Sequence, residues 1–171
     1  FFFTPKPASE ILSGLVGSEM CIRDSPYTPA VNLVFALDEA LKMMREEGLD
    51  NIFLRHNKHK LAMSNAVKAL NLKLFADEKY LSPSITAVKT EGIDAEEFRK
   101  TIKNNFDILL AGGQDHMKGK IFRVGHLGYV NDRDIITVVS AISNTLLNLS
   151  KITTQQAGEA LVVASRYLEE N

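Results

Sequence analysis

LLAGGQDHMKGKIFRVGHLG, residues 109–128, carries the clearest sign of a β-sheet in the sequence. Two runs rich in aliphatic residues, DILLAGG at 107–113 and KIFRVG at 120–125, alternate partly between apolar and polar positions, as strands do. The segment between them is rich in Gly, Gln and Asp, which favours a turn. The pattern predicts two strands paired as a hairpin.

Two more strands and a short helix precede this hairpin. LKLFA at 72–76 and ITAVKT at 85–90 are short and rich in aliphatic residues, so we expect strands there. Asp94 and Glu97 have the spacing of a capping box in front of EEFRKTIKNNF, which predicts a helix over 96–106.

Four longer helices flank this central part. Thr28 as a cap and Pro29 at the first helical position predict a helix that ends at Gly48. Apolar spacing predicts three others, which begin after caps at Asn51, Asn131 and Thr153. In the helix after Asn51 we expect the basic residues to face away from the apolar side, and we expect the last helix to end near Leu168.

The order of elements favours an α+β fold. Because neighbouring strands are joined partly by short turns, we expect a small, mainly antiparallel sheet with helices packed on one face. The length of 171 residues, with 45% hydrophobic and 24% charged residues, is typical of one globular domain.

Composition also limits the classes of partner. The net charge is −1 and the basic residues are spread along the chain, which argues against nucleic acid or a polybasic membrane contact. No apolar run approaches the roughly 20 residues that span a bilayer. We expect a small molecule or another protein chain as the partner, and neither nucleic acid nor membrane.

The first 25 residues fit none of these patterns. LVGSEMCIRDS, residues 15–25, back-translates to a nucleotide sequence that resembles a common transposon-type sequencing adapter, and KPASEI lies close to what its outer part would encode. A secretory signal is a poor alternative, because its apolar core is short and no A-x-A site closes it. We interpret residues 1–25 as a disordered, non-native leader and expect the natural protein to be longer. The one cysteine, Cys21, lies in this leader.

Arg123 is the first candidate binding residue. It lies in an apolar strand that runs into Gly125 and Gly128, where a ligand can approach the backbone closely. A guanidinium there could hold a carboxylate through two parallel hydrogen bonds. A strand arginine on the solvent face is the simpler alternative.

Other features have a structural and a functional interpretation. Thr28 and Pro29 at a helix start suit either simple capping or a phosphate. His56 and His59 could share a metal, but the neighbouring cations favour a solvated basic face and no metal. Ala111–Lys120 suits a hairpin turn or a mobile loop beside a site. No Ser, Cys and His combination makes a credible nucleophile, so we name no catalytic residue.

The segments YTPAVNLVFALDEAL, SPSITAV, LLAGGQDHMKGKIFRVGHLG and DRDIITVVSAI together resemble the C-terminal part of class V aminotransferases. The resemblance covers about residues 26–149 and is closest to the alanine–glyoxylate and serine–pyruvate aminotransferases. It implies that residues 26–171 are the small C-terminal domain, with its entry helix, of a pyridoxal-phosphate enzyme of fold type I.

The resemblance assigns roles to two residues. It implies that Arg123 binds the α-carboxylate of the substrate and that Thr28 binds the cofactor phosphate in the site of the dimer partner. A tyrosine found in some members would fall on Ser25, where it cannot be assigned. The Schiff-base lysine, the aspartate on the pyridine nitrogen and the stacking aromatic belong to the large domain upstream, so we expect this chain alone to be inactive.

The expected parent is a cytoplasmic, homodimeric transaminase that moves an amino group from alanine or serine to glyoxylate or another 2-oxo acid. Two alternatives stay open. One is a non-catalytic α+β ligand-binding or dimerisation module, which a fully exposed Arg123 would support. The other is a class V relative such as a ureidoglycine–glyoxylate transaminase or a protein named as a soluble hydrogenase subunit.

Overall fold

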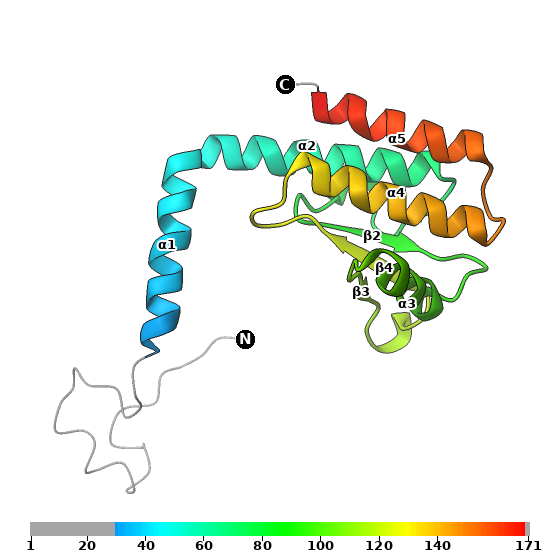
Figure 1. The fold of residues 1–171 in the computed structure, drawn as a ribbon, viewed down its shortest axis with the longest axis horizontal. Coiled ribbons are helices and arrows are strands. Elements are labelled where there is room, and N and C mark those ends of the chain that lie inside the picture. The colour runs from blue at the N-terminus through cyan, green and yellow to red at the C-terminus, as the bar shows by residue number, and fades with distance from the viewer. Residues whose placement is uncertain (1–29, 170–171) are drawn as a thin grey trace, which may run out of the picture. The chain divides into compact units, whose positions relative to one another are not determined.

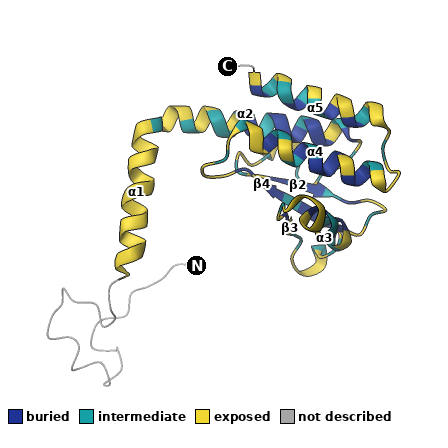
Figure 2. Cartoon of the chain, in the orientation of Figure 1, coloured by how far each residue is buried: buried dark blue, intermediate teal, exposed yellow. Residues whose placement is uncertain are grey.

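The computed structural model describes residues 30–169 of the chain, which divides into two units, residues 1–46 and 47–171. The helix α1 (Val31–Glu47) accounts for the described part of the first unit (Figure 1). None of its residues is buried, although its sequence is amphipathic (Figure 2). The predicted helix up to Gly48 is confirmed over this range.

The second unit holds the sheet and the remaining helices. Their order matches the predicted order of elements: α2 (Leu49–Ala69), β1 (Lys73–Leu74), a 3₁₀ turn (Glu78–Tyr80), β2 (Ile85–Lys89), α3 (Ala95–Phe106), β3 (Ala111–Gly112), a 3₁₀ turn (Asp115–Met117), β4 (Ile121–Gly125), α4 (Asp132–Asn148) and α5 (Thr154–Glu169).

The four strands form one antiparallel sheet in the order β1-β2-β4-β3. Val88 of β2 faces Phe122 of β4, and these side chains are buried on the inner face. The next pair along these strands is Ala87 and Arg123. Because side chains alternate along a strand, this pair lies on the outer face. The predicted hairpin of the last two strands is confirmed.

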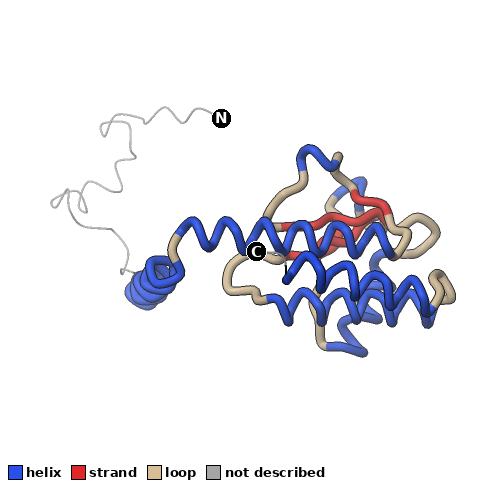
Figure 3. The backbone as a smooth tube through the Cα atoms, turned by 90° about the horizontal axis from the view of Figure 1, so that it is seen from above, coloured by secondary structure: helices blue, strands red, loops and turns tan. Residues whose placement is uncertain are grey.

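The core lies between the inner face of the sheet and the helices, as Figure 2 shows by its buried residues. α2, α4 and α5 run beside one another over the sheet (Figure 3). Phe98 of α3 packs on Phe122 with ring centroids 5.2 Å apart. The expected α+β fold, with helices on one face of an antiparallel sheet, is therefore confirmed.

Two helix ends explain where the sequence prediction differs from the structure. α3 ends at Phe106, and the capping residue after it, Asp107, adopts a left-handed conformation with φ of 57°. Because of this turn the following strand begins later in the sequence, so β3 covers only Ala111–Gly112 and not all of 107–113.

α2 begins at Leu49 after Gly48, whose φ is 82°, and the prediction of a cap at Asn51 is wrong. The Asn51 side chain instead donates to the Glu47 carbonyl at 2.8 Å.

The caps predicted at Asp94, Asn131 and Thr153 are confirmed, whereas the cap predicted at Thr28 lies outside the described residues. Asp94 accepts hydrogen bonds from the backbone of Glu96 and Glu97. Asn131 and Asp134 form a reciprocal capping box at the start of α4.

Between residues 30 and 169, no helix has the length and apolar character that crossing a membrane requires.

Candidate functional site

Arg123 lies in the middle of β4, on the outer face of the sheet. Its Nε donates to the carbonyl oxygen of Gly112 on the neighbouring β3 at 2.9 Å. The side chain is half-buried, so it is not the fully exposed arginine that would support a non-catalytic module. No carboxylate among residues 30–169 pairs with it. The outer edge of the guanidinium therefore remains available for an external anion.

Small residues surround the Arg123 side chain on the sheet surface. In the sheet register Arg123 lies directly between Ala87 of β2 and Ala111 of β3. The next residue on this face of β4 is Gly125, which is opposite Ile85. Because cross-strand neighbours are the residues that could crowd a side chain, these residues leave room above the guanidinium.

The acceptor of Arg123 is itself fixed by α3. A Cβ atom on Gly112 would lie 2.5 Å from Nη1 of Arg99 and 2.8 Å from Oε1 of Glu96. Arg99 also donates to the Leu110 carbonyl at 2.7 Å. A side chain at this position would therefore have to displace the ends of Arg99 and Glu96, which now lie against the backbone of β3, the strand that orients Arg123.

The segment that leaves β4 is anchored at His126. Its backbone N–H donates to the Ser84 carbonyl at 2.9 Å, and its Nε2 lies 2.9 Å from the Thr86 hydroxyl oxygen in a hydrogen bond. The imidazole is fully buried. Burial, together with the nearby His59, lowers the pKa of His126 from its ordinary 6.5 to about 4, so the ring is neutral at pH 7.

Further along the same loop, α2 holds the backbone through Arg55. Its Nη1 donates to the carbonyl oxygens of Gly128 and Val130 at 2.9 and 3.0 Å. Its Nη2 binds a carboxylate oxygen of Glu47 at 2.9 Å, and this hydrogen bond lowers the pKa of Glu47 below its ordinary value. One guanidinium thus connects Glu47, two residues before α2, to the loop after β4.

One turn later, Lys58 and His59 bind Asp132 at the start of α4. Lys58 Nζ lies 2.9 Å from Oδ2 and His59 Nε2 lies 2.9 Å from Oδ1, while Lys58 also donates to the Leu168 carbonyl of α5 at 3.0 Å. Burial opposes the ionisation of Asp132, but these two partners outweigh it and keep its pKa low. We call Arg55, Lys58 and His59, with their partners Glu47 and Asp132, the α2 clamp.

The sequence predicted that the basic residues of α2 form a solvated face, and this prediction is wrong for the residues of the α2 clamp. His59 is fully buried, and burial lowers its pKa although the hydrogen bond to Asp132 opposes this. His56 instead bonds the Ile52 carbonyl at 2.8 Å through Nδ1. The spacing of Arg55, Lys58 and His59 could have indicated a common face, but only the fold shows which face. In the described part of the chain no three His, Cys, Asp or Glu side chains gather as a metal site.

Residues of the α2 clamp line one side of a groove of about 900 Å³. Arg133 and Tyr167 are also among the residues that line it. Arg123 is not among the residues that line the groove. Thr28, the predicted phosphate contact, lies outside the described residues, as does the proposed leader.

The segment Ala111–Lys120 forms a tight connection, in which Gly113 approaches the Met117 carbonyl too closely for a side chain.

Known proteins are similar to this chain over most of its length. The small subunit of a soluble hydrogenase from Synechococcus is 52% identical over 144 residues, which cover 84% of this chain and 37% of the relative. The serine–glyoxylate aminotransferase of Methylorubrum extorquens is 35% identical over 149 residues, or 85% of this chain and 36% of the relative. No family model matches the chain.

A solved structure agrees with these relatives. The ureidoglycine–glyoxylate aminotransferase of Bacillus subtilis superimposes with a TM-score of 0.75 at 31% identity, covering 82% of this chain and 37% of that one. The fold is thus that of an aminotransferase C-terminal domain. The homologues of the chain are class V aminotransferases, a family of pyridoxal-phosphate-dependent enzymes. The chain spans little more than a third of the length of these relatives.

Proposed function

We propose that residues 26–171 are the small C-terminal domain of a pyridoxal-phosphate-dependent aminotransferase. The reaction moves an amino group from a small amino acid, such as alanine or serine, to glyoxylate or another 2-oxo acid. The observation that carries the proposal is Arg123, an arginine without a carboxylate partner among the described residues, on the uncrowded outer face of the sheet.

Arg123 suits the carboxylate that amino acids and 2-oxo acids share. A planar guanidinium presents parallel N–H groups to a carboxylate, and the bond from Nε to Gly112 fixes its plane. A group that holds both substrates in the same way allows one site to serve both halves of a ping-pong reaction. The role of Arg123 is therefore to bind and orient the substrate.

The described residues do not by themselves fit the cofactor. When bound in the parent enzyme, the cofactor would supply the electron sink of the reaction. A lysine that carries it needs a desolvated pocket, and none of the lysines within residues 30–169 is buried. We therefore propose that the lysine is in the large domain, that Thr28 contributes to the phosphate site, and that the 171-residue chain alone is inactive.

We extend the proposal to assembly and location. A phosphate contact made by Thr28 in the site of a partner subunit requires a homodimer. The likeness to the aminotransferases supports a cytoplasmic location. We propose no nucleic acid as a partner, because the net charge is −1 and the sequence has no basic tract.

The test uses the full-length protein that contains residues 26–171. Arg123→Gln should lower kcat/KM for glyoxylate on the order of 10²-fold or more, because the substrate carboxylate loses a charged partner. Arg166→Gln, on the exposed part of α5, is the matched control and should leave the activity unchanged. An Arg123→Gln enzyme with undiminished kcat/KM would contradict the assignment.

A second candidate function comes from the names of the relatives. Two relatives, 52% and 54% identical to this chain, are named as subunits of soluble hydrogenases. The same full-length protein should be assayed for hydrogen-dependent dye reduction. Hydrogen uptake without transamination would favour the hydrogenase subunit over the aminotransferase.

A further inference from the structure

The residues that follow Arg123 continue the alternation of β4 beyond the end of the strand. His126 is buried like Val124, whereas Gly125 and Leu127 are exposed. The ladder also continues, because the His126 N–H bonds the Ser84 carbonyl of the segment before β2. Arg123, Gly125 and Leu127 therefore occupy successive positions on the outer face.

The side chain of Leu127 lies over Gly125. A Cβ atom on Gly125 would be 3.5 Å from Cδ2 of Leu127, which is van der Waals contact. Leu127 is 56% exposed and Ile85, opposite Gly125, is 38% exposed. Together they form an apolar rim around the bare backbone of Gly125, at the position on the outer face of β4 that follows Arg123.

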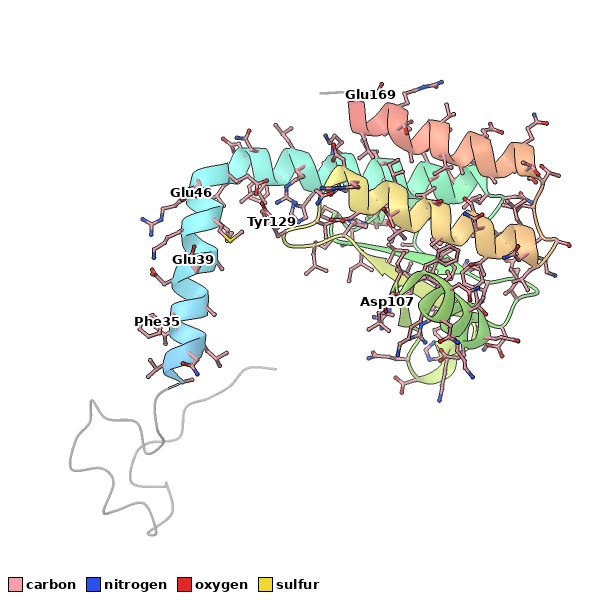
Figure 4. All side chains as sticks on the ribbon, viewed as in Figure 1. Phe35, Glu39, Glu46, Asp107, Tyr129 and Glu169 are labelled. Atoms are coloured by element: carbon pink, nitrogen blue, oxygen red, sulfur yellow. The ribbon has the colours of Figure 1, made fainter. Side chains whose placement is uncertain are left out.

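Leu127 is held in place from both sides. On one side His126 is tied to β2 through Thr86 and to the segment before β2. On the other side the carbonyl oxygen of Gly128 accepts a hydrogen bond from Arg55. Figure 4 shows this loop between β4 and α4, with Tyr129 at its turn. An exposed leucine anchored in this way presents a fixed apolar surface.

We infer that Leu127 determines which substrate side chains the site accepts. The inference rests on the proposed function, in which Arg123 holds the substrate carboxylate. A carboxylate bound there places the adjacent carbon of the substrate above Gly125, and the group attached to that carbon then meets Leu127. Leu127 thus favours 2-oxo acids with no side chain or a methyl group and excludes longer ones.

The experiment measures kcat/KM of the full-length enzyme for glyoxylate, pyruvate and 2-oxobutyrate. Leu127→Ala should raise the ratio for 2-oxobutyrate over glyoxylate on the order of tenfold, the effect typical of one methylene group in an apolar pocket. Leu127→Phe should lower the ratio for pyruvate over glyoxylate, and it provides the opposite shift if the alanine variant folds poorly. Leu149→Ala, at a leucine that is 46% exposed after α4, is the control and should leave both ratios unchanged.

The outcomes separate this inference from the proposed function. Transamination that depends on Arg123 but shows the same ratios in both Leu127 variants would overturn the inference alone. A full-length protein without any transamination that depends on Arg123 would overturn the proposed function, and the inference with it.

Discussion

Arg123 and Gly112 are joined by a hydrogen bond from a side-chain nitrogen to a backbone oxygen across two strands, at 2.9 Å. The carbonyl that orients the guanidinium is therefore positioned by β3, an edge strand of two residues. Contacts of this kind contribute to the stability of the second unit, and their contribution can be measured on the purified chain.

Gly112→Ala should destabilise the fold by about 1 kcal/mol or less, because the new methyl group would overlap the ends of Arg99 and Glu96, and these flexible side chains can move aside. Urea unfolding followed by circular dichroism measures the change. The control is Gly158→Ala in α5, where nothing lies within 4 Å of the added atom. It should stabilise the chain by about 0.5–1 kcal/mol, since alanine suits a helix interior better. Equal effects of the two substitutions would contradict the tight approach at Gly112.

Asp132→Asn should lower the free energy of unfolding by about 2–3 kcal/mol, since it leaves Lys58 and the buried His59 without their charged partner. Glu91→Gln removes the partner of Lys73 in an exposed pair and is the matched control. Its expected effect is below about 1 kcal/mol, as for other surface ion pairs. If the two substitutions cost the same, Asp132 is not the centre of the α2 clamp.

The stability of the second unit should fall as the pH is lowered from 6.5 to about 4. In the unfolded chain His126 takes up a proton near its ordinary pKa of 6.5, whereas in the fold it resists protonation down to about 4. The unfolded state binds more protons in this window, so stability is present above it and declines on the order of 3 kcal/mol across it. His59, whose pKa is also lowered, acts in the same direction.

Urea unfolding at a series of pH values measures this decline. His126→Gln should flatten the curve between pH 6.5 and 4, whereas His116→Gln, at an exposed histidine, should leave its slope as it is. A slope that His126→Gln leaves unchanged would show that His126 is not the titrating group.

Arg55→Met should loosen the loop after β4, because the carbonyl oxygens of Gly128 and Val130 lose their donor. Hydrogen exchange followed by mass spectrometry should show faster exchange in peptides that cover residues 126–130. Peptides from α3 should exchange at the original rate. Unchanged exchange in residues 126–130 would mean that the α2 clamp does not hold this loop.

Local patterns were sufficient to predict the order of the helices and strands. Apolar spacing and caps such as Asn131 depend only on residues close in sequence, and these predictions are confirmed. The predicted boundaries are wrong where the backbone conformation of a single residue determines where a helix or strand begins. Asp107 in its left-handed conformation shortens β3, and Gly48 rather than Asn51 begins α2.

The α2 clamp could not be predicted, because its contacts join residues far apart in the chain. Arg55, Lys58 and His59 look like an ordinary polar face until the start of α4 is placed against them. Arg123, in contrast, could be identified as a candidate because its apolar strand and following glycines are local features. Its carboxylate-binding role stays a prediction until the Arg123→Gln enzyme is measured.

The order β1-β2-β4-β3 has a consequence for how the chain folds. The central strands β2 and β4 are separated in sequence by residues 90–120, which include α3 and β3. Closing so long a loop costs entropy before any contact between these strands forms. We therefore expect α3 and the β3–β4 hairpin to assemble early, and the docking of β2 to set the folding rate.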